Sequence, residues 1–302
     1  MDPAAHRLGS ALCIASAIAF GAMAIFGKLA YDAGVGLLTL LFVRFSIAAP
    51  VLWIAALRRP AALSGTSRRT MLGAFALGAV GYSMQAALYF AALTRMDASL
   101  LSMLLYTFPA MVAVAAIVLG REHADPARLG ALLLASIGLV LVLASAKPGA
   151  LDPLGAALAL GAALIYTTYI LVSQGIAGRL SPTVLSALVC TGAAVSLAAG
   201  SAALGELRPG EVTPAGWGWL AGIALVSTVA AVSLFFAGLK RVGPTTASIL
   251  STVEPVVTVV LAFAVFGELL GALQMLGGAL VVGAVLVLAS YRPREAMGVA
   301  AA

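Results

Sequence analysis

Three ionisable side chains, Lys28, Arg44 and Glu254, lie inside apolar runs that are long enough to span a lipid bilayer. Placing a charge in hydrocarbon costs about 2.5 kcal/mol or more, so each side chain needs a partner or a water-filled cavity, and each is a candidate functional residue. Lys28 could reach the membrane surface through its long stem. Arg44 lies deeper, and we expect it to pair with an acid or with helix carbonyls in a structural role.

Glu254 is the acid among these residues, and it directly precedes Pro255. A buried carboxylate can bind a substrate group, carry a proton or make a structural hydrogen bond, and the sequence leaves these roles open. Pro109 and Pro255 interrupt two apolar runs at mid-length, where proline removes a backbone donor and bends a helix. The bends could act as gates or as static kinks that shape packing. Both interpretations place these two helices at the centre of the molecule.

Tyrosines and small hydroxyl residues recur at helical spacing in several apolar runs. Tyr82, Gln85 and Tyr89 are three and four positions apart, and therefore share one helix face. Such a face offers apolar surface with hydrogen-bonding tips, which suits a compact amphipathic ligand, although hydroxyl residues also join membrane helices. The complete candidate set for substrate binding is Tyr82, Gln85, Tyr89, Ser102, Tyr106, Tyr166, Tyr169, Ser248, Ser251, Thr252 and Glu254.

Composition identifies the elements that must position these residues. The chain has 302 residues, of which 63% are hydrophobic and 9% are charged, with a mean hydropathy of +1.12. Soluble domains carry about 25% charged residues, so this chain is predicted to be an all-α integral membrane protein. Helices are expected because sheet edges would leave backbone groups unpaired in lipid. Ten transmembrane helices are predicted, over residues 8–31, 37–57, 71–93, 98–119, 128–146, 154–174, 183–203, 215–239, 245–266 and 271–290.

The second half of the chain repeats the first at a fixed offset. Residues 89–122 align without a gap on residues 235–268, at an offset of 146 positions, so that Pro109 falls on Pro255 and Glu254 on Phe108. Five spans in each half reverse the membrane orientation of the second half. We therefore expect two inverted five-helix repeats, over 8–146 and 153–290, an arrangement typical of secondary transporters.

Lysine and arginine gather on one side of the predicted spans, which places both termini in the cytoplasm. The net charge of +6 is explained by these basic residues at the cytoplasmic ends of the spans, and it requires no nucleic-acid partner. The sequence shows no metal-binding cluster, no nucleotide-binding glycine loop and no cofactor motif. Small-residue surfaces on the spans 128–146 and 271–290 could serve packing within each half or a homodimer, so a monomer and a homodimer both remain open.

Two segments carry a resemblance to a known family. Residues 108–122 (FPAMVAVAAIVLGRE) and 254–268 (EPVVTVVLAFAVFGE) each lead from a proline to a glutamate, and Arg44 lies in the second span. These features resemble the EamA-type repeats of the drug/metabolite transporter superfamily, and among its branches the YddG-type exporters of aromatic amino acids. The resemblance implies a ten-helix fold with a central cavity, export of small metabolites, and a bacterial inner membrane. The first-helix glutamate of the small multidrug exporters is missing.

The expected function is export of small organic metabolites, including apolar and aromatic amino acids, by alternating access through a central cavity. Efflux of toxic or drug-like compounds by the same fold is an alternative, and a non-transporting membrane scaffold or sensor is a second. An intramembrane enzyme would need paired acids, a Ser/Lys or Ser/His set or a metal cluster within the spans, and only isolated candidates occur. The expected partners are a small-molecule substrate and the lipid bilayer.

Overall fold

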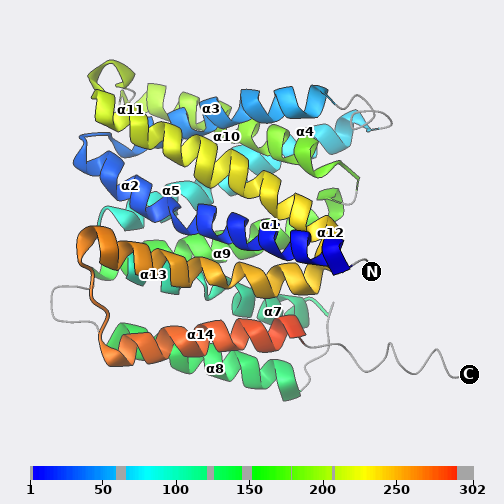
Figure 1. Cartoon of the computed structure of the whole chain (residues 1–302). Coiled ribbons are helices and arrows are strands. Elements are labelled where there is room, and N and C mark those ends of the chain that lie inside the picture. The colour runs from blue at the N-terminus through cyan, green and yellow to red at the C-terminus, as the bar shows by residue number, and fades with distance from the viewer. Residues whose placement is uncertain are drawn as a thin grey trace, which may run out of the picture.

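The structure is a computed structural model that describes residues 3–58, 66–120, 126–144, 152–177, 179–205 and 208–290. Every regular element in these ranges is helical, and the helices lie roughly along one common direction (Figure 1). The prediction of an all-helical chain is thus confirmed. In chain order the elements are α1 (Pro3–Gly21), α2 (Met23–Asp32), α3 (Leu37–Leu57), α4 (Arg68–Ala76), the π-helical segment η2 (Leu77–Tyr82), α5 (Ser83–Leu93), α6 (Ala98–Leu105), α7 (Phe108–Val118), α8 (Pro126–Ala144), α9 (Pro153–Ala177), α10 (Pro182–Leu204), the 3-10 turn η3 (Pro209–Glu211), α11 (Pro214–Ala221), the π-helical segment η4 (Gly222–Ala230), α12 (Ala231–Ser251), α13 (Val253–Phe266) and α14 (Ala272–Ser290).

Seven helical stretches within the described ranges are long and apolar enough to cross a membrane. They are His6–Asp32, Leu37–Leu57, Arg68–Leu93, Ala98–Val118, Pro153–Ser173, Pro182–Leu204 and Pro214–Leu239. Three shorter apolar helices, Leu129–Val142, Val253–Phe266 and Ala272–Val287, coincide with the remaining predicted spans. Helices satisfy their own backbone groups, which is why an apolar chain of this kind adopts them in lipid.

The predicted connection 240–244, between the spans 215–239 and 245–266, is helical in the structure, because α12 covers Ala231–Ser251. The chain still reverses its direction along α1 after Val242, since Gly9 lies against Arg241 and Val242 whereas Gly21 lies against Glu254 and Val257. Pro244 removes a single backbone donor, and its fixed φ is compatible with helical backbone. Helical structure therefore continues past the end of the apolar stretch Pro214–Leu239.

Two helices widen into π-helical turns at matching places in the sequence repeat. These segments are η2 and η4, and Tyr82 at the end of η2 corresponds to Thr228 in η4 at the 146-residue offset. A π-helical turn shifts the direction of the side chains that follow it, and such turns are frequent at functional sites. Both segments contribute side chains to the cavity described below.

Helix breaks precede the two mid-span prolines. α6 ends at Leu105 and α7 begins at Phe108, so Pro109 lies in the first turn of α7. In the second half Thr252 separates α12 from α13, and Pro255 lies in the first turn of α13. Proline fits these positions because the first-turn N–H groups have no partner within the helix. The breaks leave nearby side chains and carbonyl groups free to make other contacts.

Helices from the two halves pack closely against each other. α3 lies along α10, α1 along α12, and α8 along α14, as Figure 1 shows. A Cβ atom added at Gly192 on α10 would overlap the carbonyl oxygen of Phe75, and one added at Gly78 on η2 would overlap that of Val189. These backbones touch because glycine has no side chain.

The small-residue surfaces of α8 and α14 face each other. A Cβ added at Gly138 would lie 2.6 Å from the carbonyl oxygen of Gly277, and the reverse distance is also 2.6 Å. The sequence suggested packing within each half or between two copies of the chain. In the structure these glycines instead join the two halves of one chain.

Candidate functional site

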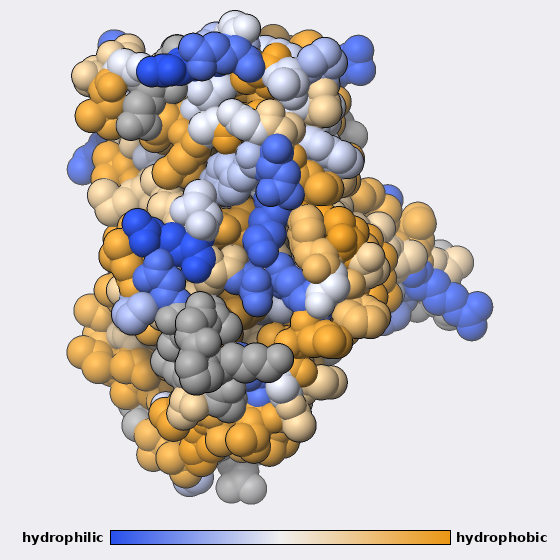
Figure 2. Space-filling view, turned by 90° about the vertical axis from the view of Figure 1, so that its left-hand side faces the viewer, coloured by the Kyte–Doolittle hydropathy of each residue, from blue (hydrophilic) through white to orange (hydrophobic). Residues whose placement is uncertain are grey.

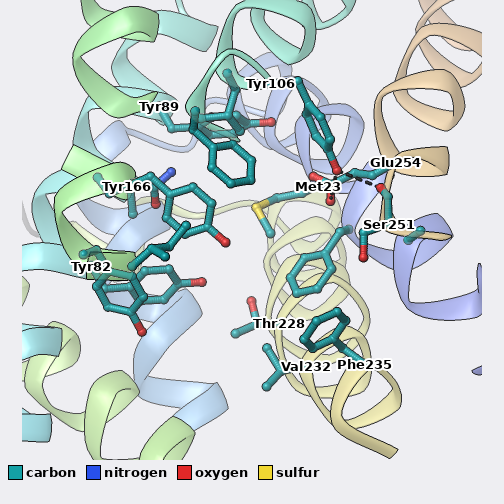
Figure 3. Close-up of a pocket in the computed structure, with 18 of the residues that line it drawn as sticks. Met23, Tyr82, Tyr89, Tyr106, Tyr166, Thr228, Val232, Phe235, Ser251 and Glu254 are labelled. Carbon is teal, nitrogen blue, oxygen red and sulfur yellow. Dashed lines mark hydrogen bonds between the residues drawn. The ribbon is translucent and has the colours of Figure 1, made fainter. Parts of the chain in front are cut away.

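A cavity of about 670 Å³ lies at the centre of the bundle (Figure 3). Side chains from both halves line it, from α1, α2, α3, η2, α5, α6 and α7 in the first half and from α9, α10, η4, α12, α13 and α14 in the second. Nine of the eleven predicted substrate-binding residues are among them. They are Tyr82, Gln85, Tyr89, Tyr106, Tyr166, Tyr169, Ser251, Thr252 and Glu254.

The other two predicted substrate-binding residues, Ser102 and Ser248, are not among these lining residues. Ser102 is buried in α6 and does not border the cavity, because it lies on a helix face that packs against neighbouring helices. The side chain of Ser248 lies outside the described residues. Of the two prolines, Pro109 lines the cavity, whereas Pro255 is buried in α13 and does not.

Glu254 lies at one side of the cavity, held by Tyr106. The Tyr106 hydroxyl is 3.0 Å from Oε2 of Glu254 and 2.8 Å from the carbonyl oxygen of Ser251, so it bridges α13 and α12 (Figure 3). The contact joins the two helix breaks, because Tyr106 lies in the first break and Ser251 lies directly before the second. Oε1 of Glu254 makes no hydrogen bond to the part of the chain that the structure describes. A cationic or hydrogen-donating solute can therefore approach this oxygen.

Arg44 is the cation that borders the cavity. Its Nε donates a hydrogen bond to Oγ1 of Thr228 at 2.9 Å, and its Nη2 donates to the hydroxyl of Tyr82 at 3.2 Å. The guanidinium carbon lies 4.8 Å from the ring centre of Phe45 and 5.6 Å from that of Phe90. Aromatic faces attract cations, so these rings stabilise the buried charge.

The expectation for the partners of Arg44 was wrong. They are hydroxyl groups rather than an acid or helix carbonyls, and through Arg44 the helix α3 contributes to the cavity lining. The reason is that η2 and η4 both pack on α3 or its neighbour α10, which brings Tyr82 and Thr228 to the guanidinium. The spacing of residues within one helix cannot predict this contact, because its partners lie on other helices.

A run of aromatic rings connects the surroundings of Arg44 to those of Glu254. Ring centres are 5.7 Å apart for Tyr82 and Tyr169, and 6.1 Å for Tyr169 and Tyr166. Phe108 follows, 4.6 Å from Tyr166 and 5.8 Å from Tyr106. These are separations at which aromatic pairs attract each other. The rings provide one continuous apolar wall that carries phenolic hydroxyl groups.

Several lining residues were missed in the sequence, including Met23, Thr228 and Phe235. Thr228 had a usable signal, because it is the counterpart of Tyr82 at the repeat offset. Phe108 had one too, as the counterpart of Glu254. Met23 and Phe235 resemble ordinary apolar helix residues, and no local pattern distinguishes them.

Lys28 lies away from the cavity, in an ion cluster at one end of the bundle. Its Nζ is 2.7 Å from Oε1 of Glu268 and 3.6 Å from Oδ1 of Asp97. Glu268 also accepts hydrogen bonds from the backbone N–H groups of Ala98 and Ser99 and from the Ser99 hydroxyl. It thus caps the N-terminus of α6, where carboxylates are favoured. The cluster joins α2 and α6 in the first half to the segment after α13 in the second.

Figure 2 looks onto this end of the molecule, where α13 ends and α14 begins, and shows hydrophilic residues across its middle and upper part. Arg95 and Asp152 form a second ion pair, with Nη1 and Oδ2 2.8 Å apart. The Asp152 carboxylate also accepts hydrogen bonds from the backbone N–H groups of Leu154 and Gly155 at the start of α9. The hydrogen bond from Arg95 holds the pKa of Asp152 below its ordinary value.

Replacing Glu268 with glutamine should destabilise the protein by about 2 kcal/mol near neutral pH. Burial alone raises the pKa of Glu268, but hydrogen bonds from Lys28 and Ser99 outweigh it and hold the pKa below its ordinary value. A carboxylate with a lowered pKa stabilises the fold above its unfolded pKa of about 4.3, and this contribution is lost as the pH falls through the folded pKa.

Thermal unfolding of the purified protein in detergent, followed from pH 7 downward, tests this prediction. The difference between wild type and Glu268→Gln should shrink as the medium becomes acidic. Glu211→Gln is the matched control, because Glu211 pairs with Arg208 at 3.5 Å on an exposed turn, where such pairs contribute about 0–1 kcal/mol. A difference that is independent of pH would contradict the role assigned to the Glu268 carboxylate.

Comparison with known proteins agrees with this architecture. The model of the EamA-like transporter family matches residues 7–144 and 153–290, two stretches separated by the same 146 positions (153 − 7 and 290 − 144) as the internal repeat. The chain is 30% identical over 285 residues to an uncharacterized transporter of Archaeoglobus fulgidus, covering 93% of this chain and 96% of that one. It is 27% identical over 276 residues to the uncharacterized transporter YcbK of Bacillus subtilis, covering 89% and 88%. A crystal structure with 18% sequence identity shares the fold, with a TM-score of 0.65 over 93% of this chain and 96% of that chain.

Proposed function

Because the chain belongs to the EamA-like transporter family, we propose that it is a secondary transporter that exports small organic metabolites, including apolar and aromatic amino acids. One observation carries the proposal: a central cavity of about 670 Å³, walled by tyrosines from both halves, with Glu254 and Arg44 on its surface. A ligand site with apolar walls and a few fixed polar groups is suited to a small amphipathic solute. In this proposal the YddG-type exporters of aromatic amino acids are the nearest functional branch.

The proposed membrane arrangement is ten helices in two inverted five-helix repeats, 8–146 and 153–290, in a bacterial inner membrane. The family matches and the internal repeat support it, as does the position of the chain ends: α1 begins and α14 ends on the same side of the bundle (Figure 1). Both termini are placed in the cytoplasm by the distribution of lysine and arginine. The protein would act as a monomer or a homodimer.

The proposed cycle uses the helix breaks as gates. The cavity opens to the cytoplasm, takes up its solute among α5, α7, α9 and α13, and releases it outside when the two halves rock past each other. Pro109 and Pro255 lie directly after the breaks in α6–α7 and α12–α13, where a change of bend would move Tyr106 and Glu254 together. Alternating access of this kind needs no nucleotide.

The charges of the cavity argue against a polyanionic substrate. Among the described lining residues Arg44 is the one cation, and it already donates to Thr228 and Tyr82. A diphosphate would require several basic side chains to neutralise it. Neutral and dipolar solutes fit the site better.

Flux assays in proteoliposomes test the proposal directly. Purified protein should move at least one radiolabelled amino acid with an apolar or aromatic side chain, and a panel of drug-like cations tests the alternative of toxin efflux. The assays run with and without an imposed pH gradient, and identical flux in both conditions would dismiss Glu254 as a proton-coupling group. Absence of flux across the whole panel would favour a non-transporting scaffold or sensor.

Tyr106→Phe should weaken substrate binding about tenfold, seen as a higher KM for transport. The variant keeps the ring but removes the hydroxyl that positions the Glu254 carboxylate, and hydrogen bonds to charged groups contribute about 1.5–3 kcal/mol. Tyr31→Phe is the matched control, because the Tyr31 hydroxyl bonds the carbonyl of Phe90 outside the cavity lining. Equal KM values for the two variants would remove Tyr106 from the binding site.

A further inference from the structure

We infer that the cavity selects dipolar solutes whose cationic and anionic groups stand at opposite ends of an apolar or aromatic spacer, with the cation at Glu254 and the anion at Arg44. The inference rests on the proposed function and narrows its substrate class. It separates such solutes from α-amino acids, which carry both charges on one carbon atom.

The first step is that the two charges do not neutralise each other. Glu254 and Arg44 are the two charged residues among the described residues that line the cavity, and no ion pair within the described ranges includes either of them. Arg44 uses Nε and Nη2 for Thr228 and Tyr82, and Nη1 makes no hydrogen bond to the described chain. A buried charge without an opposite charge beside it is costly, so each one favours an opposite charge on the bound solute.

The second step is that the two charges lie at different ends of the aromatic wall. Arg44 contacts the hydroxyl of Tyr82, whereas Glu254 contacts the hydroxyl of Tyr106, and Tyr169, Tyr166 and Phe108 lie between these two rings. Figure 3 places Tyr82 and Tyr106 on separate sides of the open space.

The third step concerns the fit of the solute. An α-amino acid that places its ammonium group at Glu254 keeps its carboxylate at the same end of the ring wall, beside Tyr106, and leaves the guanidinium of Arg44 without an anionic partner. A solute with an amine at one end and a carboxylate at the other satisfies both groups and lays its spacer along the rings. Electrostatic complementarity of this kind governs specificity more than overall affinity.

Two isomers provide a sharp test because they contain the same atoms. Phenylalanine carries both charges on one carbon, and 4-(aminomethyl)phenylacetic acid carries them on opposite sides of the ring. We expect kcat/KM for transport in proteoliposomes to be at least about tenfold higher for the second isomer, because it alone pairs both buried charges. Equal or faster transport of phenylalanine would overturn the inference and leave the proposed export intact. Transport of other panel solutes but of neither isomer would also overturn it, and no flux of any solute would overturn the proposed function as well.

Removing the cation from the solute tests the Glu254 end of the cavity. 4-(Hydroxymethyl)phenylacetic acid lacks the cation, and wild type should transport it about a hundredfold less efficiently than the amine. In Glu254→Gln this preference should fall to about one, since glutamine has the size of glutamate without its charge. A preference for the amine that survives in Glu254→Gln, with the variant correctly folded by its melting curve, would show that another group recognises the cation.

Discussion

Glu254→Gln is expected to lower transport of an amine-bearing solute about a hundredfold. Glutamine keeps the volume of the side chain and can still accept the Tyr106 hydrogen bond, so the packing around α13 should survive. What it loses is the negative charge, and removing one partner of a buried ion pair costs about 3–5 kcal/mol. The initial rate of uptake into proteoliposomes, compared at equal amounts of inserted protein, measures the loss.

The control for this experiment is Glu211→Gln. Glu211 lies on an exposed turn between α10 and α11, distant from the cavity lining, and its substitution changes the formal charge by the same amount. Transport by this variant should match wild type. Unchanged transport by Glu254→Gln would show that the carboxylate is a structural hydrogen-bond acceptor and would remove it from the recognition site.

Gly192→Ala is expected to destabilise the protein by about 3 kcal/mol or more, and to reduce the yield of folded protein in the membrane fraction. The added methyl group would overlap the backbone carbonyl of Phe75, and backbone cannot rotate aside as a flexible side chain can. α10 would have to separate from α4, which contains Phe75, and from η2, which contains Ala79 and carries Tyr82 into the cavity. Melting temperature in detergent and the fraction of monodisperse protein measure the effect.

Gly200→Ala tests whether the contact rather than the residue type is responsible. Gly200 lies in the same helix, α10, and an added Cβ there has no neighbouring atom within 4 Å. Alanine is favoured over glycine inside helices by about 0.5–1 kcal/mol, so this variant should be as stable as wild type or more so. Equal loss of stability in both variants would contradict a backbone contact at Gly192.

The candidate site was predicted from residues whose helical spacing places them on one face of a helix. Tyr82 and Tyr89 on one helix face, and Tyr166 and Tyr169 on another, could be grouped from their spacing, and all four line the cavity. Ser102 fitted the same rule but packs inside the bundle. Periodicity identifies a polar face, and it does not show whether that face meets a cavity or another helix.

Arg44 and Lys28 show the limit of reasoning from single residues. Both were identified as charges that needed partners, yet neither partner could be named from the sequence. Lys28 pairs with Glu268, 240 positions away, and Arg44 bonds Thr228, 184 positions away. Such contacts depend on which helices become neighbours, and an apolar helix surface is compatible with many neighbours.

The sequence by itself determined the helical class of this protein, the places of most of its apolar segments and the 146-residue repeat, because in lipid each helix must satisfy its own backbone groups and the pattern for doing so is local. Only the tertiary structure decided that Glu254 and Arg44 face one cavity at opposite ends of an aromatic wall. The relative placement of helices depends on close contacts such as Gly192 against Phe75, which join residues more than a hundred positions apart and leave no periodic trace along the chain.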